Sequence, residues 1–159
     1  IVFWFLPYAI ATGNAMVVKP SEKVPLTMIK IFELIDQLDL PDGLVSLVHG
    51  GKYSVDALLE HPLVKAVSFV GSTPVAKYIY SKGTQNGKRV QAQGGAKNPV
   101  LLMPDCDVEM TSKIVADSVY GCAGQRCLAA SVIITVDDNK RKLKDSLCDM
   151  VKSRKTGYG

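Results

Sequence analysis

The sequence lacks the features of membrane, secreted and signal-directed proteins. Its longest apolar run, IVFWFLPYAIA at positions 1–11, contains Pro7 and is much shorter than the roughly 20 residues that a membrane-spanning helix needs. The run also has no basic leader and no cleavage pattern of a signal peptide. We therefore predict that it is a buried segment of a globular protein whose chain extends upstream of Ile1.

Cysteine is scarce. The four cysteines have no regular spacing, and a chain of 159 residues can fold without disulfide bonds. The closest pair, Cys122 and Cys127, has no second pair of Cys or His ligands downstream, which disfavours zinc. We expect no metal, and we expect a reducing compartment, either the bacterial cytoplasm or the mitochondrial matrix.

An excess of charge is absent from most of the chain. Residues 1–139 carry a net charge of −1, whereas residues 140–159 carry +5. The apolar residues of this basic tail recur at helical spacing: Leu143, Leu147, Met150 and Val151. The pattern predicts an amphipathic surface helix with a solvated basic face. A nucleic-acid or membrane patch is the alternative, but no aromatic residues interleave with the charges, so we expect neither partner.

Short β-branched runs alternate with longer helical patterns. The predicted strands are 15–19, 44–50, 66–71, 88–93, 100–104 and 131–136. The predicted helices are 26–40, 54–61 with Ser54 as its cap, 74–82, 108–120 and the basic tail. This alternation requires parallel strand pairing. We predict an α/β fold with an open, mostly parallel twisted sheet, helices on both faces, and an internal boundary in the glycine-rich stretch 94–99.

The segment VGSTPVA, positions 70–76, is a candidate phosphate site. Gly71 ends a predicted strand, and Ser72 and Thr73 precede a helix, whose N-terminal N–H groups and dipole favour an anion. The dinucleotide fingerprint G-x-G-x-x-G is absent. The alternative is therefore a simple capped helix, with Ser72 or Thr73 as the N-cap and Pro74 in the first turn.

Two charged residues follow the first predicted strand. Ligands collect at the carboxyl ends of strands in open α/β sheets, so Lys19 and Glu22 could hold ribose hydroxyls or phosphates. The alternative is a capping box in which Ser21 and Glu22 open the next helix. His49 and His61 lie at the ends of elements, and we assign both to structural roles.

The stretch VYGCAGQRCLAAS, positions 119–131, offers a candidate nucleophile. Small residues before Cys127 would let a substrate approach, and the adjacent Arg126 would favour the thiolate form. The other cysteines, Cys106, Cys122 and Cys148, fit the commoner role of buried apolar thiols.

Taken together, the motifs resemble the aldehyde dehydrogenase superfamily. They occur in the family's order and spacing: ATGNAMVVKPSEKVPLT, PDGLVSLVHGG, AVSFVGSTPVA, KRVQAQGGAKNP, MPDCD and GCAGQRC. The segments HGGKYSVDALLEHP, VGSTPVAKYIY, NGKRVQAQGGAKN and AGQRC are most similar to the methylmalonate-semialdehyde dehydrogenases. That branch releases its product as a coenzyme A thioester.

The resemblance implies an NAD site on a Rossmann-like domain. In the family, the matching positions line the adenosine side, contact the pyrophosphate and lie near the nicotinamide. They are, in that order, Lys19, Glu22 and Lys23, then Gly71 and Ser72, and finally Gly94.

The resemblance also implies a thiol mechanism. Cys127 would attack the aldehyde carbonyl, give a thiohemiacetal, pass a hydride to NAD and become a thioacyl-enzyme. Arg126 matches the position that holds the distal carboxylate of a semialdehyde substrate. Gln93 stands where hydrolytic members have a glutamate base, and an amide cannot take a proton, so the thiol of coenzyme A would release the product. Ala76 and Pro99 also depart from the family's common residues.

The family's members are much longer than this chain. The asparagine that donates to the oxyanion would precede Ile1, and the residues that hold the nicotinamide ribose would follow Gly159. We expect residues 1–95 to belong to an NAD-binding domain and 96–159 to begin a catalytic domain, in a fragment that is inactive alone. The parent would be a homotetramer acting on a small aldehyde. Alternatives are a hydrolytic aldehyde dehydrogenase and a non-catalytic nucleotide-binding or interaction module.

Overall fold

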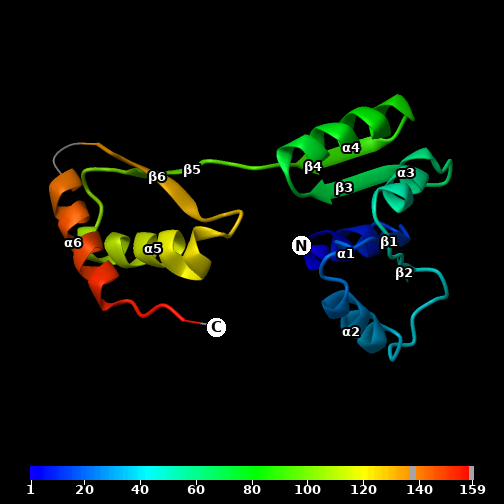
Figure 1. Cartoon of the computed structure of the whole chain (residues 1–159), viewed down its shortest axis with the longest axis horizontal. Helices are drawn as coiled ribbons and strands as arrows, with labels where there is room; N and C mark the ends of the chain where they lie inside the picture. Colours follow the sequence, from blue (N-terminus) through cyan, green and yellow to red (C-terminus); the bar gives the residue numbers. More distant parts are fainter. Residues whose placement is uncertain (137–138, 158–159) are drawn as a thin grey trace. The chain divides into compact units, whose positions relative to one another are not determined.

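The computed structural model describes residues 1–136 and 139–157. The chain divides into two compact units, Ile1–Gly94 and Gly95–Gly159 (Figure 1). Helices and strands alternate in both, and every strand pair is parallel, which confirms the α/β class. The strands form three two-stranded sheets, β1–β2, β3–β4 and β5–β6.

The first unit contains four strands and four helices within its described residues. They are α1 Val2–Ala11, β1 Met16–Val18, α2 Leu26–Ile35, β2 Val45–Leu47, α3 Lys52–Glu60, β3 Ala66–Val70, α4 Thr73–Gln85 and β4 Arg89–Gln93. Helix α4 connects β3 to β4 and packs on both strands (Figure 1). Gly83 permits this close packing, because a Cβ there would lie 2.6 Å from Val90 Cγ2.

One buried cation joins the loop before β3 to the start of β4. Lys88 is 7% exposed, and its Nζ donates to the carbonyls of His61 (2.7 Å) and Val64 (2.6 Å). A buried ammonium needs such partners, since burial without hydrogen bonds is costly. The buried apolar residues of the same unit include Leu59, Ala76 and Ile79.

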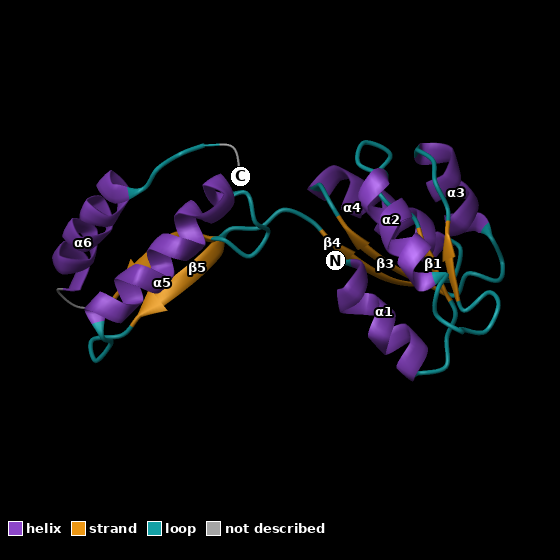
Figure 2. Ribbon diagram, turned by 90° about the horizontal axis from the view of Figure 1, so that it is seen from below, coloured by secondary structure: helices purple, strands orange, loops and turns teal. Residues whose placement is uncertain are grey.

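The second unit is a βαβ unit followed by a helix. Its elements are β5 Asn98–Leu102, α5 Val108–Tyr120, a short 3₁₀ segment Gly121–Gly124, β6 Ala130–Thr135 and α6 Asn139–Ser153. Figure 2 shows α5 lying along the β5–β6 pair. Asp107 caps α5 by accepting a hydrogen bond from Met110 N (3.0 Å). Helix α6 packs on α5 and buries Leu143, as the amphipathic pattern predicted.

The N-terminal segment differs from its prediction. It forms α1, which buries Leu6 but leaves Phe3, Trp4 and Tyr8 at least 48% exposed. The prediction of a buried segment is wrong. Helix α1 has apolar residues on all its sides, but packing on β1 covers only one side of the helix. Among the described residues, no helix combines the length and apolarity required to cross a membrane.

One predicted helix start and one predicted capping motif are also wrong. Helix α3 begins at Lys52 with Gly51 as its N-cap, and the Ser54 hydroxyl donates to His49 O (3.2 Å) instead of capping the helix. Helix α2 begins at Leu26, as predicted. The alternative capping box of Ser21 and Glu22 does not form, because Ser21 Oγ accepts from Lys23 N within a turn before the helix.

Candidate active site

The residues after β1 are held against the end of β2. Lys19 Nζ donates to Gly50 O (2.9 Å) and to Pro20 O, and its side chain is only 16% exposed. Glu22 Oε2 lies 3.9 Å from the same nitrogen and is 59% exposed. Lys23 is exposed beside it. An ammonium has three N–H donors, so Lys19 keeps one for a ligand after binding two carbonyls.

A second group of predicted residues meets at the N-terminus of α4. Ser72 is the N-cap of this 13-residue helix, without a side-chain capping bond, and no acidic residue occupies the first turn. Gly71 N donates to Gln93 O (3.1 Å), which joins the ends of β3 and β4. A Cβ on Gly94 would lie 2.9 Å from Thr73 Oγ1 and 3.1 Å from Thr73 Cα. Gly71, Ser72 and Gly94 therefore converge on a helix end that favours anions.

In the second unit, Cys127 lies just after an irregular turn. Cys122 and Ala123 have φ values of 52° and 54°, and Gly124 has a φ of 70°. Left-handed backbone costs roughly 1–2 kcal/mol at each non-glycine residue, so the fold holds two such residues at a cost. Two further turns follow, with Gln125 N donating to Cys122 O (3.1 Å) and Ala129 N donating to Arg126 O (3.0 Å).

The candidate nucleophile and its neighbours are exposed. Cys127 is exposed, and the adjacent Leu128 has an exposed fraction of 73%. Ala129 and Ala130, directly after them, are buried. The chain therefore passes from solvent to core within a few residues, and Cys127 lies on the accessible side.

Arg126 contacts the turn that precedes it. Its Nε donates to Cys122 Sγ (3.3 Å), and its guanidinium lies over Gly121, where a Cβ would come within 3.4 Å of Arg126 Cζ. Within the described residues, the two terminal guanidinium nitrogens have no hydrogen-bond partner. A planar group held at Nε and open at its other end suits a two-pronged contact with a carboxylate.

The prediction of buried structural thiols is wrong for two cysteines. Cys122 and Cys148 are exposed, and Cys106 is half-buried. Helical spacing places Cys148 on the outer side of α6, while Cys122 lies in the left-handed turn. All four cysteines are free thiols. Over residues 1–136 and 139–157, no group of three or more His, Cys, Asp or Glu side chains could hold a metal ion.

Comparisons with known proteins decide the family. The sequence profile of the aldehyde dehydrogenase family matches residues 1–159. The chain belongs to the aldehyde dehydrogenase family. It is 48% identical over 156 residues to malonate-semialdehyde dehydrogenase 1 of Bacillus licheniformis, covering 98% of this chain and 32% of that protein. The chain thus spans about a third of the length of such relatives.

Solved structures agree with this membership. The methylmalonate-semialdehyde dehydrogenase of Oceanimonas doudoroffii is similar with a TM-score of 0.84 and 44% identity, over 94% of this chain and 31% of that one. Betaine aldehyde dehydrogenase of Staphylococcus aureus, solved in complex with NAD⁺, gives a TM-score of 0.83 and 35% identity, over 94% of this chain and 30% of that one.

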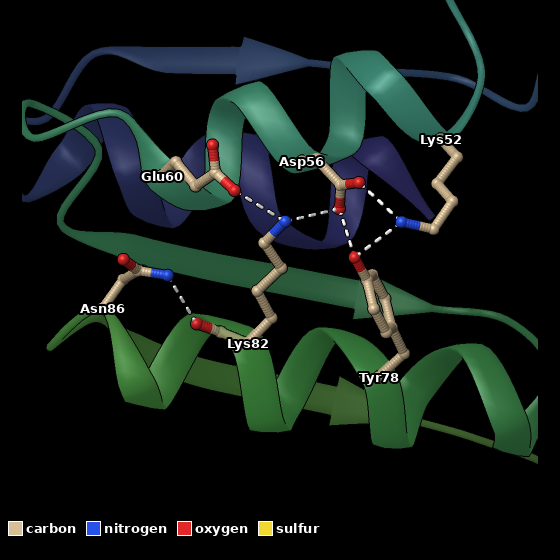
Figure 3. A network of polar contacts seen from close by, with 6 residues as sticks. All are labelled: Lys52, Asp56, Glu60, Tyr78, Lys82 and Asn86. Atoms are coloured by element: carbon tan, nitrogen blue, oxygen red, sulfur yellow. Dashed lines mark hydrogen bonds and ion pairs between the residues drawn. The ribbon is translucent and has the colours of Figure 1, made fainter.

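A network of charges in this aldehyde dehydrogenase chain was not anticipated from the sequence. Asp56 on α3 accepts from Lys52 (2.6 Å), from Lys82 on α4 (3.1 Å) and from the Tyr78 hydroxyl (Figure 3). Lys82 also pairs with Glu60 (2.7 Å). The residues of this network recur at i, i+4 spacing within α3 and within α4, but the contacts between the two helices form only because α3 packs on α4.

The network shifts the ionisation of its members. The hydrogen bond from Lys52, and then that from Tyr78, holds the pKa of the Asp56 carboxyl well below its usual range. The hydrogen bond to Glu60 raises the pKa of Lys82 above that of an ordinary lysine. Asp56 and Lys82 therefore stay ionised and fasten α3 to α4, the helix whose N-terminus carries Ser72.

Sequence reasoning also missed the two side chains that anchor the chain around Cys127. Asn98 Nδ2 donates to Cys127 O (2.8 Å) and to Ala129 O (3.0 Å). On the other side, Ser118 Oγ of α5 accepts from Ala130 N (2.9 Å). Such bonds span 12 to 31 residues, so no local pattern signals them.

Proposed function

We propose that the chain is part of an NAD-dependent, coenzyme A-acylating dehydrogenase of malonate or methylmalonate semialdehyde. The high identity to malonate-semialdehyde dehydrogenases supports the substrate class. Gln93, in place of a carboxylate base, is the observation that favours coenzyme A over water. Arg126 and Cys127, which are adjacent in sequence, supply the substrate contact and the nucleophile.

The strand ends of the first unit fit NAD. Phosphate groups suit the N-terminus of α4, where Ser72 is exposed and Gly71 and Gly94 bring backbone close to the helix end. Lys19 offers its remaining N–H donor to a ribose hydroxyl, and Glu22 and Lys23 flank it. When bound there, NAD supplies the hydride acceptor.

Cys127 carries the covalent chemistry in this proposal. Its thiolate attacks the carbonyl carbon of the aldehyde and forms a C–S bond, which gives a thiohemiacetal. Oxidation of the thiohemiacetal, for which bound NAD would be the hydride acceptor and which also releases the hydroxyl proton, would leave a thioester on Cys127. The Arg126 guanidinium binds the distal carboxylate, so the aldehyde carbon is presented to the neighbouring sulfur.

Gln93 determines which nucleophile ends the cycle. It is the last residue of β4, its side chain is exposed, and its carbonyl is occupied by Gly71 N. An amide cannot remove a proton from water, so hydrolysis of the thioester is not assisted there. The thiolate of coenzyme A attacks the thioester carbon instead, expels Cys127 as a thiolate and leaves as acyl-CoA.

The test is an assay of the full-length protein with and without coenzyme A. We expect NADH formation to stall without coenzyme A, and the thioester to be the product with it. Gln93→Glu should raise hydrolytic turnover roughly 100-fold, the lower end of the usual range for general-base assistance. Gln91→Glu is the matched control, because Gln91 is an exposed glutamine on the same strand, two residues earlier. A free acid as the product of the unmodified protein would identify a hydrolytic enzyme and refute the proposal.

We also propose that the whole protein is a homotetramer in the bacterial cytoplasm. Free thiols at all four cysteines suit a reducing compartment. Leu101, Val132 and Ile134 of the β5–β6 pair are 42–59% exposed, and a subunit interface would cover such apolar side chains. Light scattering of the full-length protein measures the oligomeric state, and a monomer at micromolar concentration would contradict this proposal.

A further inference from the structure

Asn98 joins the start of β5 to the chain segment that carries Cys127. Its side-chain Nδ2 donates to Cys127 O at 2.8 Å and to Ala129 O at 3.0 Å. Both partners are carbonyl oxygens, so only the amide nitrogen of Asn98 can face them. Both N–H donors of one half-buried side chain are thus used on the backbone around the candidate nucleophile.

The backbone of Asn98 is itself fixed. Its N–H donates to Ser131 Oγ at 2.8 Å. The pairing of β5 with β6 shifts register here, since Asn98 pairs with Ala130 while Pro99 pairs with Val132. Proline has no N–H for a strand ladder, and such irregularities re-aim side chains at strand ends. The origin of the Asn98 side chain is therefore set by the sheet.

Cys127 depends on an anchor of this kind. The residues before it adopt left-handed backbone, and neither Cys127 nor Leu128 is covered by the core. A nucleophile needs a defined direction toward its substrate, and displacement by about 1 Å can lower the rate roughly 100-fold. The Asn98 amide, which is positioned by the sheet, donates a hydrogen bond to the carbonyl of Cys127 itself and so fixes the direction of the Cys127 side chain.

We infer that Asn98 is a positioning residue that fixes the Cys127 backbone, and thereby the direction of its thiol, through paired hydrogen bonds to Cys127 O and Ala129 O. This inference rests on the proposed function, because it gives Cys127 the role of nucleophile. Asn98 does not touch the reacting atoms and acts only through the backbone of Cys127.

Two variants of the full-length protein test the inference. Asn98→Ala removes both side-chain donors. Asn98→Asp keeps the size and the backbone N–H but turns an acceptor toward two carbonyls. Asn86→Ala is the matched control, because Asn86 Nδ2 also donates to a backbone carbonyl, Lys82 O at 2.9 Å, but at the C-terminal end of α4.

The first readout is hydrogen exchange in peptides covering residues 125–130. We expect about tenfold faster amide exchange there in both Asn98 variants, as expected for loss of hydrogen-bond stabilisation. Exchange in α6 should stay unchanged. The second readout is steady-state kinetics, where kcat should fall roughly 10- to 100-fold while KM for the aldehyde changes less than about twofold. Asn86→Ala should alter neither.

Three results would overturn the inference: unchanged exchange in residues 125–130, equal acceleration throughout the unit, or local acceleration with unchanged kcat. Failure of the proposed function gives a different result. If Cys127→Ala kept full activity, Cys127 would not be the nucleophile, although the exchange data would still report whether Asn98 anchors the turn.

Discussion

Two candidate sites are held in place differently: the strand-end site of the first unit, formed by Gly71, Ser72 and Gly94, and the Cys127 turn of the second unit, residues 121–130. Around Gly71, Ser72 and Gly94, the regular backbone of the parallel β3–β4 pair and of the start of α4 places each residue. Around Cys127, the backbone is irregular, and side chains such as Asn98 and Ser118 hold it.

The difference concerns how each site tolerates change. A site formed by strand ends is sensitive mainly to added volume, because a new side chain displaces neighbouring backbone. A site held by side-chain hydrogen bonds is sensitive to loss of individual donors and acceptors. Placement by strand ends suits the binding of a large cofactor, and placement by side-chain hydrogen bonds suits the positioning of a single reactive atom.

The largest effect should come from the reactive atom itself. Cys127→Ala in the full-length protein removes the nucleophile, and we expect dehydrogenase turnover to fall by about a thousandfold or more. NAD binding, measured by fluorescence titration, should persist because it belongs to the strand-end site. Cys148→Ala is the matched control, since Cys148 is an exposed free thiol on α6. Substantial NADH formation by Cys127→Ala would contradict the thiol mechanism.

A smaller effect should follow when volume is added to the strand-end site. In Gly94→Ala, the new Cβ would meet Thr73 Oγ1 and Cα at 2.9 Å and 3.1 Å, so the N-terminus of α4 must shift. We expect KM for NAD to rise about tenfold, equivalent to about 1.4 kcal/mol of binding free energy. KM for the aldehyde serves as the internal control. Equal rises in both constants would show that the two sites are not distinct in this way.

Loss of one acceptor in the Cys127 turn should change substrate preference moderately. Cys122→Ala leaves Arg126 Nε without its partner at 3.3 Å. We expect KM for a semialdehyde bearing a carboxylate to rise roughly three- to tenfold, the scale of one modest hydrogen bond. KM for propanal, which lacks a carboxylate, should not change. Cys122→Ser restores an acceptor and should recover much of the affinity; failure to do so would exclude this role.

The contrast between the regions also explains what the sequence could reveal. Helix α5 was predicted at its observed bounds from the local pattern of residues 108–120, and the structure shows local ends as well, with Asp107 as the N-cap and Gly121 as the C-cap. The α/β class followed from the alternation of elements. The anchoring by Asn98 was not predictable, because its partners lie 29 and 31 residues away. The left-handed turn was not predictable either, because residues such as Cys122 and Ala123 rarely adopt positive φ. The start of α3 was misplaced because Ser54 satisfies its hydroxyl with His49 O instead of a helix N–H.

The smallest effect should come from the charge network that fastens α3 to α4. Asp56→Asn weakens its contacts with Lys52 and Lys82, and we expect the thermal midpoint to fall by a few degrees at neutral pH, with kcat unchanged. Asp149→Asn is the matched control, because Asp149 forms an exposed ion pair on α6 and such pairs contribute little.

The pH dependence of this effect identifies its electrostatic origin. The pKa of Asp56 is lowered in the folded chain, chiefly by Lys52 and then by Tyr78. Below about pH 4, the unfolded carboxyl binds a proton that the folded one does not, so the stabilisation is complete above this pH and is lost as pH falls toward the folded pKa. The difference in thermal midpoint between the unmodified protein and Asp56→Asn, followed by circular dichroism, should therefore shrink below about pH 4. A difference that stayed constant down to pH 2.5 would assign the effect to packing of α3 on α4.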